Sequence, residues 1–78
     1  MNQFNRITFD PNMMGGRACI RGMRVTVSLV LNLISNGMTT GQIMADYPYL
    51  EDEDIRQSLQ YAAWLAEEYV QPLEFSPA

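Results

Sequence analysis

The 78-residue sequence contains no histidine, no lysine and a single cysteine, Cys19. Without histidine the chain lacks the usual general base, and one cysteine cannot complete a zinc site. The lone thiol also excludes an internal disulfide, so nothing in the composition indicates an oxidising compartment. These absences argue against an enzyme, a metal site and a bound cofactor, and they favour a protein that works by binding.

The sequence also lacks long apolar stretches. No window approaches the roughly 20 apolar residues that a bilayer-spanning helix needs, and residues 1–25 show no apolar run behind a basic start. We therefore expect a cytoplasmic protein that has no membrane contact. With 47% apolar residues the chain can form one small domain, residues 1–78. Chains this short often gain stability by self-association, so we also expect a homodimer.

Positive charge is scarce and unevenly placed. Residues 1–24 hold four arginines and one aspartate, a net charge of +3, while residues 25–78 hold one arginine and eight acidic residues, a net charge of −7. The planar guanidinium suits paired contacts with carboxylates or phosphates. The candidate partner- or DNA-binding residues are therefore Arg6, Arg17, Arg21 and Arg24. Solvated arginines on ordinary turns are the alternative for each of them taken singly.

The local patterns predict a mainly α fold that begins with a short β element at about residues 6–25. Gly22 is expected at a bulge or tight bend, where its positive φ costs nothing. Three helices are expected at about residues 27–36, 40–47 and 52–70, followed by a tail at 71–78. The last two helices follow one another like a helix-turn-helix, although the turn between them is longer than the usual three or four residues.

The first predicted helix has clear ends and an unusually narrow polar stripe. Thr26 is the expected N-cap and Gly37 the expected left-handed residue after the helix, while Thr39 and Gln42 form a capping box for the next helix. Because apolar residues fill most of its circumference, the first helix is either the central core helix or is shared with a second subunit. Leu29 and Leu33 are candidate interface residues on this helix, and Met23 is another just before it.

The third predicted helix begins with acidic residues 51–54, which suit the positive end of the helix dipole. Projected at 100° per residue, its expected core face comprises Ile55, Leu59, Ala62, Ala63, Ala66 and Val70. Trp64 falls among polar residues on the opposite side. It is either covered by the tail, through Leu73 and Phe75, or presented to a partner as an interface residue.

The order of segments FDPNMMGGRACIRGMRVTV, NLISNGMT and IMADYPYLEDEDIRQSLQYA resembles the prokaryotic family called domain of unknown function 433. The resemblance covers about residues 7–63. The chain departs from the family pattern at Met23, where threonine is usual, at Ala18, where proline is usual, and at Glu51, where a serine or threonine cap is expected.

The resemblance implies a homeodomain-like fold and a role as a VapB-type antitoxin encoded beside a PIN-like ribonuclease toxin. The predicted function is therefore that of a non-enzymatic antitoxin, which neutralises the toxin and also represses its own operon. The arginines would then face the carboxylates of the toxin or the phosphates of DNA. The alternative is a helix-turn-helix transcriptional regulator without a toxin, although four carboxylates at the start of the would-be recognition helix would repel phosphates.

Overall fold

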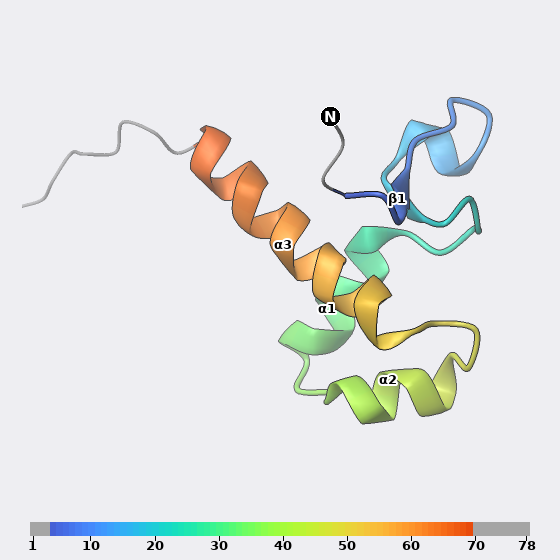
Figure 1. The fold of residues 1–78 in the computed structure, drawn as a ribbon, viewed down its shortest axis with the longest axis vertical. Helices are drawn as coiled ribbons and strands as arrows, with labels where there is room; N and C mark the ends of the chain where they lie inside the picture. Colours follow the sequence, from blue (N-terminus) through green and yellow to red (C-terminus); the bar gives the residue numbers. More distant parts are fainter. Residues whose placement is uncertain (1–3, 70–78) are drawn as a thin grey trace, which may run out of the picture.

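The computed structural model describes residues 4–69, with side chains for residues 4–67. The elements are β1 (Ile7–Thr8), a 3₁₀ turn (Met14–Gly16), β2 (Cys19–Ile20), α1 (Val27–Ser35), α2 (Thr40–Asp46) and α3 (Asp52–Tyr69). In Figure 1 the long α3 runs diagonally through the molecule, with α2 near its start and the β element on the opposite side of the picture. The expected mainly α fold with three helices after a β element is confirmed.

The β element consists of two very short antiparallel strands. Ile7 pairs with Ile20 and Thr8 with Cys19, and a single bridge joins Cys19 to Thr26. The chain reverses after β2 through Arg21 and Gly22, whose φ angles are 47° and 70°. Positive φ at both central residues is the pattern of a tight hairpin turn, and it confirms the tight bend predicted at Gly22.

The helix ends follow the local sequence signals. The Thr26 side chain accepts a hydrogen bond from the Leu29 amide at 3.0 Å, and Gly37 has a φ of 95°. Thr39 and Gln42 form both hydrogen bonds of a capping box. Because these interactions join residues at most three positions apart, the sequence alone predicts them correctly.

The apolar core lies where α1, α2, the start of α3 and the β element meet. Its buried members come from both strands, all three helices and the loops before α1 and α3: Ile7, Ile20, Val25, Val27, Val30, Ile43, Leu50 and Ile55. Only Val27 and Val30 of α1 are fully buried, while its leucines and Ile34 are half-buried. Within residues 4–69, no helix combines the length and apolar character required to cross a bilayer.

The predicted core face of α3 is correct at Ile55 and wrong over part of the rest. Leu59 is 44% exposed, Ala63 and Ala66 are also exposed, and Ala62 is half-buried; Val70 lies outside the described residues. The buried side chains around Ile55 are instead polar: Asp54, Gln57 and Ser58. The apolar pattern missed Asp54 and Gln57 because the β element packs on them through polar contacts.

Candidate functional site

Two of the predicted arginines meet at one buried carboxylate. The Asp54 side chain is fully buried and lies 3.0 Å from Arg6 (Oδ1 to Nη1) and 2.8 Å from Arg21 (Oδ2 to Nη2). Arg21 Nε donates a further hydrogen bond to Asp54 Oδ1 at 3.0 Å. Arg6 Nη1 also lies 2.7 Å from Glu51 Oε1. We call Arg6, Arg21, Glu51 and Asp54 the Asp54 cluster.

The backbone holds the two arginines of this cluster next to each other. The Arg21 amide donates to the Arg6 carbonyl at 2.8 Å, which continues the β1–β2 pairing. Arg21 Nη2 also donates to the Tyr49 carbonyl at 2.7 Å, just before α3. On the acidic side, the Glu51 amide donates to Asp54 Oδ2 at 2.8 Å, so this carboxylate also caps the start of α3. The Asp54 cluster therefore fastens the β element to α3.

Burial and hydrogen bonding act in opposite directions on Asp54. Burial raises the pKa of the Asp54 carboxyl, whereas the hydrogen bonds from Arg21, the Glu51 amide and Arg6 lower it, and the net pKa lies below its ordinary value. The hydrogen bond to Asp54 raises the pKa of Arg21. The carboxylate is therefore ionised in neutral solution and balanced by charges within the same chain.

The polar contact between the β element and α3 extends to Gln57. The buried Gln57 accepts a hydrogen bond from the Arg6 amide at 3.0 Å and donates one to Asn5 Oδ1 at 2.9 Å. Sequence reasoning missed the roles of Asp54 and Gln57. The spacing of Glu51 and Asp54 was a usable signal, because an acidic residue three positions after an N-cap can accept from the cap amide.

The other two predicted arginines lie outside the Asp54 cluster. Arg17 and Arg24 are exposed, and within residues 4–69 neither side chain forms an ion pair. Arg17 lines a groove of about 400 Å³ between α1 and α3, together with apolar side chains that include Leu31 and Leu65. Of the four predicted arginines, two therefore form ion pairs within the chain and two lie at the surface. The role of these arginines in partner binding stays a prediction.

The predicted interface residues differ in their exposure. Met23, Leu29 and Leu33 are half-buried and pack against the core. Trp64, in contrast, is 41% exposed. The tail residues Leu73 and Phe75, one predicted cover for Trp64, lie outside the described residues.

Trp64 belongs to a group of four aromatic rings that sequence reasoning did not assemble. The Phe4 ring centroid lies 5.5 Å from that of Tyr61 and 6.0 Å from that of Trp64, and Phe9 lies 6.1 Å from Tyr61. The Tyr61 and Trp64 rings are stacked at 6.1 Å. We call these four residues the aromatic cluster. Phe9 is 58% exposed, so a large part of this cluster faces solvent.

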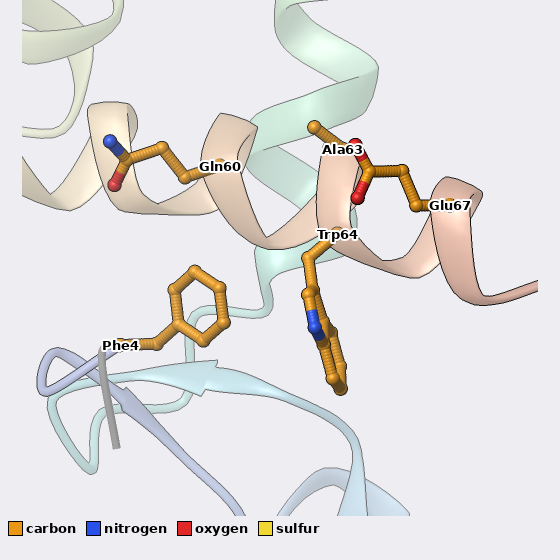
Figure 2. A pocket seen from close by; sticks show the side chains of 5 residues that line it. All are labelled: Phe4, Gln60, Ala63, Trp64 and Glu67. Atoms are coloured by element: carbon orange, nitrogen blue, oxygen red, sulfur yellow. The ribbon is translucent and has the colours of Figure 1, made fainter. Parts of the chain in front are cut away.

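A surface pocket of about 450 Å³ opens at one side of the aromatic cluster, lined by Phe4, Gln60, Ala63, Trp64 and Glu67. Figure 2 shows the Phe4 ring beside the Trp64 indole, with the polar ends of Gln60 and Glu67 carried by the neighbouring turns of α3. We call it the Trp64 pocket. Large exposed rings beside a few polar groups are typical of contact sites for other molecules. No three potential metal ligands meet among residues 4–69.

Fold and surface together define a small mainly α domain that carries an exposed aromatic patch. The chain belongs to the family described as protein of unknown function (DUF433), whose pattern matches residues 7–62. It is similar to a DUF433 member protein from Anabaena variabilis ATCC 29413, whose crystal structure matches with 30% sequence identity and a TM-score of 0.75. The match covers 82% of this chain and 63% of the Anabaena chain. No curated protein matches the sequence.

Proposed function

We propose that this chain is a non-enzymatic antitoxin of a type II toxin–antitoxin pair, which binds and neutralises a PIN-like ribonuclease in the cytoplasm. The observation that carries the proposal is the exposed aromatic cluster on an acidic protein: Phe9 and Trp64 are 58% and 41% exposed, and the chain has a net charge of −4. A ribonuclease needs a basic surface for its substrate. An acidic surface with large rings is complementary to such a partner.

Arg17 and Arg24 offer a second, positively charged contact with the ribonuclease. Both are exposed, and their guanidinium groups suit the clustered carboxylates with which a PIN-like nuclease holds its metal. Arg6 and Arg21 are occupied by Asp54 in the free chain. We therefore assign the contact with the toxin carboxylates to Arg17 and Arg24 before Arg6 and Arg21.

The test is co-expression with the product of the adjacent reading frame. We expect the two proteins to elute as one complex in size-exclusion chromatography, and we expect the ribonuclease to lose activity when this chain is added. A variant with Arg17→Glu and Arg24→Glu should bind more weakly, while Arg56→Glu, which reverses one charge on α3, serves as the control. A neighbouring product that neither binds nor loses activity would contradict the antitoxin proposal.

DNA binding is the second candidate, and it covers both autoregulation and a regulator without a toxin. The succession of α2 and α3 favours it, since these helices follow one another as in a helix-turn-helix. The charge of α3 weighs against it, because exposed Glu51 and Asp52 lie at its start. Binding to the DNA upstream of the gene should then fall steeply with salt. Absent or salt-insensitive binding would contradict this function.

We further propose that the chain forms a homodimer through α1. The half-buried Leu29 and Leu33 and the groove beside Leu31 leave apolar surface that a second copy could cover. Light scattering at micromolar concentration should give twice the mass of the chain, and Leu31→Glu should reduce it to that of a monomer. A wild-type monomer under these conditions would contradict the dimer.

A further inference from the structure

The Trp64 pocket combines features that the general antitoxin proposal does not use. Its walls are two aromatic rings, Phe4 and Trp64, whose centroids lie 6.0 Å apart at an interplanar angle of 57°. Its polar groups are the carboxylate of Glu67 and the amide of Gln60. Within residues 4–69, the Glu67 side chain forms no hydrogen bond or ion pair, and the residue is exposed.

This combination of groups selects a cation. A guanidinium or ammonium group is attracted to the face of an aromatic ring, and tryptophan gives the strongest attraction of the aromatic residues. Glu67 adds an opposite charge at the same pocket, and the Gln60 side-chain oxygen can accept a hydrogen bond. A neutral apolar side chain could fill the volume but would gain no electrostatic attraction from the Glu67 carboxylate.

The net charge of the part of the chain that includes α3 also favours a cation as the occupant of the pocket. Residues 25–78 carry a net charge of −7. The positive charge of Arg6 and Arg21 is already shared with Asp54 and Glu51. The field around α3 therefore attracts basic surfaces and repels nucleic acid phosphates.

We propose that the Trp64 pocket receives an arginine or lysine side chain from the basic RNA-binding surface of a partner ribonuclease, and this inference rests on the antitoxin function proposed above. The pocket is thus an anchor point for the toxin, separate from the Arg17 and Arg24 contact. By occupying a basic side chain that would otherwise contact RNA, it places the antitoxin in competition with the substrate.

The first experiment compares variants of the full chain in binding to the ribonuclease encoded by the adjacent gene. Trp64→Leu keeps an apolar side chain but removes the ring, and Glu67→Gln removes only the charge. We expect each to weaken binding about 5- to 30-fold, the range that a desolvated cation–π or charged contact supports. Trp64→Phe should retain part of the affinity. Asp52→Asn, which removes an exposed charge at the other end of α3, is the control and should change affinity less than about twofold.

The outcomes separate the two proposals. If the wild-type chain binds no ribonuclease, the antitoxin function and the cation site both fail. If the wild type binds and the Trp64 and Glu67 variants bind equally well, the antitoxin function stands and the cation site is wrong. If Trp64→Leu weakens binding while Glu67→Gln does not, the pocket takes an apolar side chain, and the inference of a cation is overturned.

A second experiment uses the fluorescence of Trp64, which is the sole tryptophan of the chain. In the free full-length chain we expect solvent-exposed emission that iodide or acrylamide quenches, and we expect the ribonuclease to shift the emission and protect it. Protection in the free chain at every concentration would mean that residues 70–78 cover the pocket. Protection that grows with chain concentration would mean that a second copy covers it. Either result overturns the proposal.

Discussion

The two ends of α3 differ in what their side chains contact. Its first two turns are tied to the β element by the Asp54 cluster and by Gln57, all through hydrogen bonds between residues distant in sequence. Its later turns carry exposed alanines and the partly exposed Trp64. The comparison teaches that polar contacts dock the β element on the start of α3, while part of the aromatic surface farther along the helix faces solvent.

The strongest way to break this comparison is to remove the buried carboxylate. Asp54→Ala leaves Arg6, Arg21 and the Glu51 amide without their common acceptor. Removing one partner of a buried ion pair is strongly destabilising, so we expect a loss of about 3 kcal/mol in the free energy of unfolding. Urea denaturation followed by circular dichroism measures it. Asp52→Ala, at an exposed position in the same turn, should cost far less, and equal losses would refute the role of Asp54.

Acid should produce a similar but graded effect. Because the folded-state pKa of Asp54 lies below its ordinary value, the cluster contributes its full stability above the unfolded-state pKa of about 3.9. That contribution is lost as the pH falls below this value toward the folded-state pKa. Thermal unfolding of the wild type and of Asp54→Asn between neutral and acidic pH should show a steeper decline for the wild type. Parallel declines would contradict the assignment.

Arg21→Lys sharpens the comparison because it keeps the positive charge but removes the planar guanidinium with its several hydrogen-bond donors. Lysine can place one ammonium near Asp54 but cannot also reproduce the separate Nε and Nη2 hydrogen bonds to Asp54 and the Tyr49 carbonyl. We expect a smaller loss in the free energy of unfolding than for Asp54→Ala, measured by denaturant unfolding. Arg24→Lys, an exposed site in the same segment, is the matched control and should be neutral.

The smallest effect is expected at Leu59. The apolar pattern assigns this residue to the core, but its side chain is 44% exposed. Leu59→Gln should therefore change the free energy of unfolding by no more than about 0.5 kcal/mol. A cost of several kcal/mol in the same denaturation experiment would show that Leu59 is covered in solution.

The success of sequence reasoning depended on distance along the chain. The caps at Thr26 and Thr39, the left-handed Gly37 and the three helices follow from residues within one turn of each other. The predicted helices at 27–36 and 40–47 end one residue later than the observed α1 and α2, because helix ends fray. Short-range physics of this kind can be deduced from residue type and spacing alone.

The candidate site was harder to predict because its parts come from distant segments. Arg6 and Asp54 are separated by 48 positions, and no local pattern pairs them. The acidic start of α3 was attributed to the helix dipole, which accounts for the exposed Asp52 but not for the buried Asp54. Likewise, Trp64 stood out as an anomaly in the sequence, but Phe4 and Phe9 could be placed beside Tyr61 only once the fold was known.

The hydrogen bonds between the β element and α3 also bear on how the chain reaches its native state. They join residues 51, 48 and 33 positions apart, so they form only after the chain has closed large loops. The contacts within and between neighbouring helices close shorter loops, so they cost less chain entropy. We therefore expect α1, α2 and α3 to assemble before the amino-terminal strands dock.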